Sequence, residues 1–320
     1  MDKDLVIGID VGGQTTKCGI VDARGTVLTR TVIRTDDTTD AKQFISNLAE
    51  ALKRIISEAG AEGRIRGIGV GAPNGNYYSG NIEFAPNLKW TVDGSKVIPF
   101  AKLLSEEMSI PVSLTNDANA AAVGEMTYGA ARGMKNFIMI TLGTGVGSGI
   151  VINGEVVYGH DGFAGELGHT CAVRYNGRSC GCGKSGCLEA YASAIGVART
   201  AREWLEMSDE PSALRSLENI TSKDVFEAAK EGDELARRVF AFTGRILGEK
   251  FADFIEFSAP EAIVLFGGLA HAKEFLTEPI QQAMDANVLP LWRGKVKLVY
   301  SQLKESDAAI LGASALAWEL

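Results

Sequence analysis

The chain has 320 residues, and this length favours about two domains of roughly 100 to 200 residues each over a single core. Hydrophobic residues make up 46% and charged residues 22%, which is typical of a folded globular protein and excludes extended disorder. The net charge of −8 argues against a nucleic-acid-binding protein, because phosphate neutralisation requires clustered Lys and Arg. The partners are therefore expected to be small molecules.

The start of the chain is charged and runs directly into a strand-like segment. No stretch approaches the roughly 18 to 20 apolar residues of a membrane span. We therefore expect no membrane partner and a cytoplasmic location. The five cysteines agree with a reducing compartment, because they are odd in number and three of them fall within eight positions, which favours a metal site over disulfides.

The N-terminal third alternates strand-like runs with glycine-containing turns. Residues 5–10, 17–21 and 26–33 predict a three-stranded meander. Apolar residues at helical spacing over 41–56 predict a helix, and residues 65–70 predict a strand that closes a β-α-β unit. These patterns together predict a mixed sheet covered by helices.

The same order of elements returns later in the chain. Residues 137–142, 146–152 and 155–157 predict strand, Gly/Thr turn, strand, tight turn and strand. We interpret this as an internal duplication in which each lobe begins with a hairpin whose glycine-rich bend faces the other lobe. The alternative is two unrelated glycine-rich hairpins.

The remaining elements are mostly helical. Helices are predicted at 188–206, 221–229, 233–257 and 307–318, and strands at 262–266 and 295–300. No Pro/Ser-rich linker separates the lobes, so the boundary near residues 117–135 is inferred from the repeat.

Two glycine-rich turns have the composition of anion-binding loops. In both, closely spaced glycines allow the backbone to bend sharply and expose N–H groups, while hydroxyls add further donors. The loops read Asp10-Val11-Gly12-Gly13-Gln14-Thr15-Thr16-Lys17 and Gly143-Thr144-Gly145-Val146-Gly147-Ser148-Gly149. Neither matches a Walker-A loop or a dinucleotide fingerprint that opens a helix. A tight turn explains either loop alone, but the pair favours a twin-loop nucleotide clamp.

Two further features belong with these loops. Asp10, at the end of the first strand, is suited to hold Mg²⁺ directly or through water, because Mg²⁺ prefers oxygen ligands. Capping of the turn is the alternative. Gly267-Gly268 follows a buried strand and is interpreted either as a third point of close backbone approach to the nucleoside or as a helix entry.

One histidine and three cysteines fall within nineteen residues on a glycine-rich segment. They are His169, Cys180, Cys182 and Cys187. One His with three Cys is a known set of structural Zn²⁺ ligands, and four protein ligands leave no position for a catalytic water. We therefore expect a structural zinc whose binding energy orders the loop. Free thiols are the alternative, and Cys18 and Cys171 fall outside the spacing.

Carboxylates and amides near these motifs are candidates for catalysis and for sugar binding. Asp117, between a strand and an Ala-rich helix, is suited to accept the proton of an alcohol in a phosphoryl transfer, although Asn116 or Asp117 could equally cap the helix. Glu166 and Glu189 flank the cysteine-rich loop, and a metal-tied loop would fix both. Asn87 is a third candidate, with a turn Asn and surface Glu residues as the alternatives.

At this point the chain resembles the ROK family of repressors, open reading frames and sugar kinases, in the actin-like ATPase superfamily. The motifs that carry the resemblance span nearly the whole chain. They are Asp10-Val11-Gly12-Gly13, Asn116-Asp117-Ala118-Asn119-Ala120, Leu142 to Gly147, Glu166-Leu167-Gly168-His169, Cys180 to Glu189 and Asp307-Ala308-Ala309. The resemblance implies an α/β, two-lobed actin-like ATPase (ribonuclease H-like) fold with a cleft between the lobes.

The resemblance also implies an activity and a site. It implies a hexose kinase that uses ATP with Mg²⁺, with Asp117 as the base and with a sugar site lined by Asn87, Asn116, Asp117, Glu166, His169 and Glu189. His169 would bind zinc through one ring nitrogen and reach a sugar hydroxyl with the other. Residues 300–320 would return to the first lobe, so that the domains are 1–117 plus 300–320 and 118–299. A homodimer is expected, because dimers are common in the family.

The sequence leaves four points open. Glucose, phosphorylated at its 6-hydroxyl, leads over N-acetylglucosamine, N-acetylmannosamine, mannose, fructose and allose only on frequency. The chain departs from the family pattern at Gln14, usually Thr, and at Asn74, usually Gly. A sugar-responsive repressor would carry a helix-turn-helix domain before the first strand, which we do not expect here because that strand begins at Leu5. A non-catalytic sugar-binding regulator is the last alternative, and Asp117 argues against it.

Overall fold

The computed structural model describes residues 3–320, and the chain divides into two compact units. The first unit contains residues 1–134, 149–164 and 302–320, and the second contains residues 135–148 and 165–301. Each unit has its own hydrophobic core. Both units include segments that are distant in the sequence, so the division follows contacts rather than chain order.

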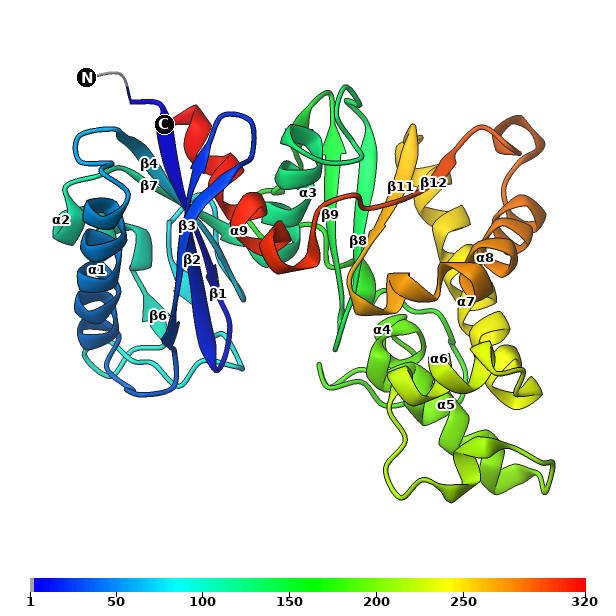
Figure 1. Cartoon of the computed structure of the whole chain (residues 1–320). Helices are drawn as coiled ribbons and strands as arrows, with labels where there is room; N and C mark the ends of the chain where they lie inside the picture. Colours follow the sequence, from blue (N-terminus) through cyan, green and yellow to red (C-terminus); the bar gives the residue numbers. More distant parts are fainter. Residues whose placement is uncertain (1–2) are drawn as a thin grey trace. The chain divides into compact units, whose positions relative to one another are not determined.

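The first unit is built on a five-stranded sheet in the order β3-β2-β1-β4-β7 (Figure 1). The strands are β1 (Leu5–Val11), β2 (Thr15–Asp22), β3 (Val27–Arg34), β4 (Ile65–Ala72) and β7 (Val112–Asn116). β1, β2 and β3 form an antiparallel meander, and β4 and β7 continue the sheet parallel to β1. The predicted meander and β-α-β unit are confirmed. A short pair, β5 (Ile82–Glu83) and β6 (Val97–Ile98), forms a separate ladder.

Helices cover both faces of this sheet. α1 (Ala41–Glu58) and α2 (Phe100–Met108) supply Phe44, Leu48 and Phe100 to the core on one face. Asp40 caps the start of α1 by accepting the N–H of Lys42. On the other face, α9 (Glu305–Ala315) and the 3₁₀ turn η5 (Leu316–Glu319) pack on β1 and β4, and α3 (Asp117–Thr127) packs on α9 (Figure 1).

The second sheet repeats the strand order of the first. Its order is β10-β9-β8-β11-β12, with β8 (Phe137–Leu142), β9 (Val146–Ile152), β10 (Glu155–Val156), β11 (Ala262–Phe266) and β12 (Lys297–Tyr300). β8, β11 and β12 are parallel. Counted along the chain, both sheets have the order third, second, first, fourth, fifth. This shared topology agrees with the predicted duplication.

The helices of the second unit are α4 (Glu189–Ala192), α5 (Ala194–Met207), α6 (Ser222–Lys230), α7 (Glu234–Ser258) and α8 (Lys273–Asn287). The 3₁₀ turns η1 (Leu167–His169), η2 (Ala213–Ser216), η3 (Gly268–Ala272) and η4 (Pro290–Trp292) connect them. Thr221 and Asp224 form the capping box of α6, which confirms the start signal in the sequence. Among residues 3–320, no helix combines the length and the apolar character that a membrane crossing requires.

The structure corrects two points of the predicted elements. The single helix predicted at 188–206 is wrong, because Ser193 adopts an extended conformation and its side chain caps a new helix by accepting the N–H of Gly196. α2 and α8 were not predicted. α8 contains Pro279 within the helix, although proline normally indicates a helix end. Gly244 on α7 allows the segment around Pro279 to pack closely against α7.

Candidate active site

Three parallel strands of the first unit bring their carboxyl ends to one edge of the sheet. In this register Asp10 of β1 pairs with Gly71 of β4, and Gly71 pairs with Thr115 of β7. Asp117 follows β7 directly and is the first residue of α3. The fold therefore places Asp10 and Asp117 at the same edge, although they are 107 positions apart in the sequence.

Gly71 lies on β4, between the strand that contains Asp10 and the strand that precedes Asp117. A Cβ atom at this position would lie 3.6 Å from Cα of Asp117 and 3.2 Å from Cβ of Ala120. Because a side chain would stand against the first turn of α3, glycine at position 71 allows the helix to begin close to the sheet.

The first turn of α3 assigns the capping role to Asn116. Its side-chain oxygen accepts the N–H of Ala118 at 2.8 Å, in the N-cap geometry that the sequence left open between Asn116 and Asp117. The Asp117 carboxylate accepts the same N–H at 2.8 Å. The Asp117 side chain is nevertheless exposed, so a substrate can reach it.

Both carboxyl groups have raised pKa values. Burial, followed by the negative charge of Asp117, raises the pKa of Asp10 to about 6, although Lys17 acts in the opposite direction. Desolvation by the surrounding protein raises the pKa of Asp117, and the hydrogen bond from Ala118 partly opposes it. Since the Asp117 side chain is itself exposed, this rise reflects the density of protein around the carboxyl and not complete enclosure.

The first glycine-rich loop is a tight β1–β2 connection closed by a hydrogen bond from Gly12 N to Thr15 O at 3.1 Å. Gly13 lies against Asn87, since a Cβ at Gly13 would be 3.0 Å from the Asn87 carbonyl oxygen and 3.3 Å from its Cβ. The predicted sugar ligand Asn87 and the predicted phosphate loop are therefore neighbours within the first unit. Asn87 is exposed.

The two threonines of this loop lie on opposite faces of β2. Lys17 pairs with Asp10, and Thr15, two residues earlier, shares that face. Thr16 pairs with the buried Val11, is itself fully buried, and its hydroxyl lies 2.8 Å from the hydroxyl of Thr35. The hydroxyl of Thr16 thus has a structural partner in the core.

Asn74, at a position where the family pattern predicts glycine, adopts the left-handed conformation that favours glycine, with φ of 51°. Its side-chain amide donates to the carbonyl oxygen of Glu83 at 3.0 Å. Asn tolerates this conformation better than most residues. The loop therefore keeps a glycine-like backbone, and the amide ties it to the following segment.

In the second unit, the second glycine-rich loop is held by a carboxylate. Glu189 accepts the N–H of Val146 at 3.0 Å, and a Cβ at Gly145 would lie 2.4 Å from the same carboxylate oxygen. Ala194 N donates to the carbonyl oxygen of Gly143 at 2.8 Å. The start of α4 and the start of α5 therefore both anchor the loop.

The third glycine pair lies beside the same loop. Phe266 at the end of β11 pairs with Thr141 of β8, and a Cβ at Gly267 would be 2.5 Å from the carbonyl oxygen of Leu142. Gly267 has φ of 103°, and the 3₁₀ turn η3 begins at Gly268. A Cβ at Gly143 or at Gly268 would meet no atom within 4 Å, which leaves both backbones accessible.

The predicted metal ligands converge. One donor atom from each of His169, Cys180, Cys182 and Cys187 lies within 4.8 Å of all the others. Cys182 Sγ is 3.7 Å from Cys187 Sγ, and Cys180 Sγ is 3.7 Å from His169 Nδ1. In a tetrahedral site with Zn–S bonds of about 2.3 Å, ligand sulfurs are separated by about 3.8 Å. The donor set and its spacing therefore fit zinc.

The histidine segment rests on the second glycine-rich loop. A Cβ at Gly168 would be 2.0 Å from the carbonyl oxygen of Val146, so only glycine permits this contact. Leu167 N donates to the hydroxyl of Ser148 at 3.1 Å. With Nδ1 directed toward Cys180, His169 Nε2 lies 4.0 Å from Glu166. The second unit therefore joins the metal ligands, Glu166, Glu189 and the glycine loop in one cluster.

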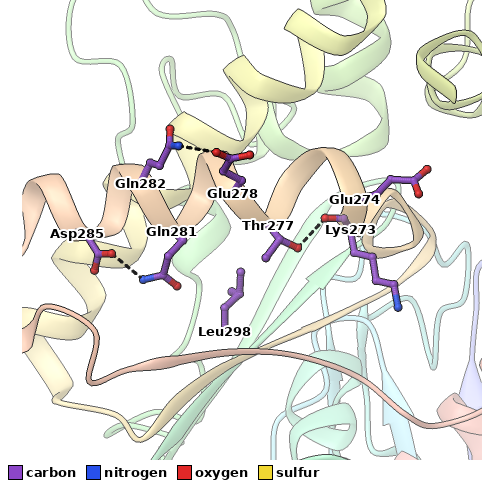
Figure 2. Close-up of a pocket in the computed structure, with 8 residues that line it drawn as sticks. All are labelled: Lys273, Glu274, Thr277, Glu278, Gln281, Gln282, Asp285 and Leu298. Atoms are coloured by element: carbon purple, nitrogen blue, oxygen red, sulfur yellow. Dashed lines mark hydrogen bonds between the residues drawn. The ribbon is translucent and has the colours of Figure 1, made fainter. Parts of the chain in front are cut away.

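A separate open depression of about 610 Å³ runs along α8 (Figure 2). Seven of its eight lining residues have polar or charged side chains, and several of these side chains form hydrogen bonds with one another, as in the pairs Gln281–Asp285 and Gln282–Glu278. The lining residues are Lys273, Glu274, Thr277, Glu278, Gln281, Gln282, Asp285 and Leu298. None of the site residues predicted from the sequence lines this depression.

Comparison with known proteins agrees with this architecture. The family model described as "ROK family" matches residues 6–319. A glucokinase of Halalkalibacterium halodurans is 37% identical over 317 residues, which cover 98% of this chain and 94% of the relative. A ROK family glucokinase from Streptomyces griseus, solved in complex with glucose and AMPPNP, has a TM-score of 0.78 and 31% identity, covering 99% of this chain and 100% of that chain.

A ROK family transcriptional regulator, a homologue of the E. coli MLC protein, is also similar, with a TM-score of 0.87 and 28% identity. The alignment covers 98% of this chain and 78% of the regulator. The fold and these similarities define an α/β protein of the actin-like ATPase class, as predicted. Within that class, the chain belongs to the ROK family.

Proposed function

We propose that this protein is a sugar kinase that uses ATP with Mg²⁺ to phosphorylate a hexose, with glucose and its 6-hydroxyl as the leading substrate and with Asp117 as the general base. The similarity to glucokinases at 32 to 37% identity over nearly the full chain supports hexose kinase activity. The observation that carries the proposal is the exposed Asp117 carboxylate, which has a raised pKa and shares a sheet edge with Asp10.

Asp117 is proposed to accept the proton of the attacking sugar hydroxyl. A general base works best when its pKa approaches the operating pH, and the raised pKa of Asp117 moves it in that direction. Its place at the first turn of α3 fixes the carboxylate relative to the sheet. As pH falls through this pKa the base becomes protonated, so kcat/KM should fall on the acidic side.

Asp10 and the first loop are proposed to bind the phosphate end of the nucleotide. The carboxylate oxygens of Asp10 suit Mg²⁺, which supplies positive charge opposite the developing phosphate charge when it is bound. Thr15 and Lys17 share a face with Asp10, so we propose them as the phosphate contacts in preference to the buried Thr16. Gly12 and Gly13 supply backbone N–H groups.

The open glycines of the second unit are proposed to bind the remainder of ATP. The loop Gly143-Thr144-Gly145 and the pair Gly267-Gly268 lie side by side at the ends of β8 and β11. Glycine at Gly143 and Gly268 leaves room for a ligand against the backbone.

The sugar is proposed to bind Asn87, Asn116, Glu166, His169 and Glu189 in addition to Asp117. Zinc on His169, Cys180, Cys182 and Cys187 is proposed to be structural, because four protein ligands leave no open coordination position. Its effect would be to order the segment that presents Glu166 and Glu189.

A sugar-binding regulator is the second candidate, because the similar structures include a ROK transcriptional regulator. A regulator needs sugar binding but no proton acceptor. The exposed carboxylate with a raised pKa at Asp117 favours the kinase.

The proposal is tested by measuring ADP release with ATP and a panel of hexoses. We expect turnover with at least one hexose, and we expect Asp117→Asn to lower kcat by about 10²- to 10⁴-fold while the protein stays folded. Asp93→Asn is the matched control, because Asp93 is exposed and pairs only with Lys42 among the ion pairs of the described residues.

Either of two results would contradict the proposal. Unchanged turnover in Asp117→Asn would remove the assigned base. Sugar binding by calorimetry without ADP release for every hexose tested would favour the regulator.

A further inference from the structure

Arg178 lies at the base of the cysteine-rich loop, two positions before Cys180, and its side chain is only 9% exposed. A buried guanidinium is costly unless its N–H groups are paired. Here the chain is also closely packed, because a Cβ at the preceding Gly177 would lie 2.6 Å from Cα of Gly186. The Arg178 side chain is therefore buried in a closely packed part of the second unit.

The Arg178 guanidinium donates hydrogen bonds to residues on two helices, α4 and α5. Nη1 donates to the carbonyl oxygen of Ala190 at 3.2 Å on α4 and to the hydroxyl of Thr200 at 2.9 Å on α5. Nε donates to Glu203 at 3.1 Å, and Glu203 also accepts from Arg199 at 2.7 Å. Although partial desolvation acts in the opposite direction, the bonds from Arg199 and Arg178 hold the pKa of Glu203 below its ordinary value.

The backbone of Arg178 forms hydrogen bonds with the end of the cysteine-rich loop and with α4. Its N–H donates to the Tyr191 hydroxyl at 2.8 Å, and the guanidinium lies 4.6 Å from the centre of the Tyr191 ring. Its carbonyl oxygen accepts the N–H of Gly186 at 2.8 Å, next to Cys187. One residue therefore connects the start of the metal loop, its end and the helix that begins with Glu189.

We propose that Arg178 is a positioning residue for the sugar site. Its hydrogen bonds hold the base of the loop, in addition to the metal at the tip, and they fix α4 so that the Glu189 carboxylate stays against Val146 N. This inference rests on the proposed role of Glu189 in sugar binding. It assigns Arg178 no contact with sugar or nucleotide.

Lysine cannot replace Arg178 in this position. The guanidinium uses a planar fork with donors directed at acceptors on two helices, whereas an ammonium group is a single point charge on a flexible stem. Arg178→Lys therefore keeps the charge and much of the length but loses the geometry. Glu203→Gln is the second variant, since it weakens the same network from the α5 side.

The test uses the full chain with its metal content measured. In Arg178→Lys we expect the KM for the hexose to rise by about 10-fold or more with kcat changed by less than about threefold, and zinc release to a chelating dye to accelerate by about 10-fold or more. Amide hydrogen exchange should also accelerate in peptides covering Val146 and residues 186–192. Arg202→Lys is the matched control, because Arg202 lies on α5 and donates to the carbonyl oxygen of Ile220 instead.

A folded Arg178→Lys with unchanged KM and unchanged exchange would overturn the proposal, as would a loss of kcat alone. If Arg178→Lys does not fold, Glu203→Gln decides by the same criteria. Hydrogen exchange at Val146 requires no catalysis. A protein without kinase activity would therefore refute the proposed function while the positioning role of Arg178 is still measured.

Discussion

Asn116 and Asp117 have different surroundings in the structure, although the sequence allows either residue to cap α3. The Asn116 amide caps α3, and the Asp117 carboxylate, although it shares the Ala118 N–H, remains exposed with a raised pKa. Asp10 lies at the same sheet edge, and the charge of Asp117 contributes to its pKa of about 6. Two carboxylates held together in this way repel each other, and a bound cation would relieve that repulsion.

The raised pKa of Asp10 gives a prediction about stability. The folded pKa of about 6 lies above the ordinary value of 3.8, so the folded state holds the proton more tightly than the unfolded state. The contribution of Asp10 to stability therefore falls as pH rises from about 4 to about 6. We expect Asp10→Asn to raise the free energy of unfolding by about 2 kcal/mol at pH 7.5 without bound nucleotide or Mg²⁺.

Urea unfolding of both proteins across this pH range measures the effect. The difference between Asp10→Asn and wild type should shrink toward zero near pH 4, where both side chains are neutral. A difference that stays constant with pH would contradict the raised pKa.

At the scale of elements, glycines set how closely α9 approaches the first sheet. A Cβ at Gly8 on β1 would lie 2.0 Å from the carbonyl oxygen of Ile310, and one at Gly69 on β4 would lie 1.9 Å from that of Ala313. Backbone atoms cannot move aside as a flexible side chain can. The glycines in these strands therefore allow a C-terminal helix to pack directly on strands formed from the start of the chain.

Because of this contact, we expect Gly→Ala substitutions along β4 to destabilise the protein by different amounts. We expect Gly69→Ala to destabilise the protein by about 3 kcal/mol, because α9 would have to shift. Gly67→Ala is the matched variant on the same face of the strand, where the nearest atom is the side-chain Cδ1 of Leu320 at 2.8 Å, and we expect about 1 kcal/mol there. Thermal or urea unfolding measures both, and equal losses would argue against a helix held by close backbone contact.

At the scale of the whole molecule, the two compact units have separate cores and different means of stabilisation. The first unit is closed by its C-terminal helix on the sheet, and the second contains the cysteine-rich loop with its metal-ligand set. Loss of a structural metal should therefore act on one unit far more than on the other.

Metal analysis of freshly purified protein should give about one zinc per chain. Prolonged chelation should accelerate amide exchange in residues 165–191, because the loop loses the ion that orders it, while β1, β2 and β4 keep their protection. Cys187→Ser should reproduce this pattern without chelator, and Cys18→Ser, in the core of the first unit, is the matched cysteine control. Uniform loss of protection in both units would contradict a local role.

The sequence by itself predicted the features that depend on local pattern. Strand-like runs separated by glycine-containing turns predicted the meander β1–β3, helical spacing predicted α1 and α7, and the density of Cys and His predicted a set of metal ligands that converge in the structure. The repeat of strand, glycine turn and strand predicted two sheets, which share one strand order. Each of these signals is contained within a few neighbouring residues.

Tertiary structure decided what depends on partners that are distant in sequence. Thr16 pairs with the buried Val11 of β1 and shares a strand face with the buried Cys18, so the strand register places Thr16 in the core. The network of Arg178 has no comparable local signal, since its acceptors lie 12 to 25 positions away. The chain order of residues determines which side chains are available, but the register of strands and the packing of helices determine which of them meet.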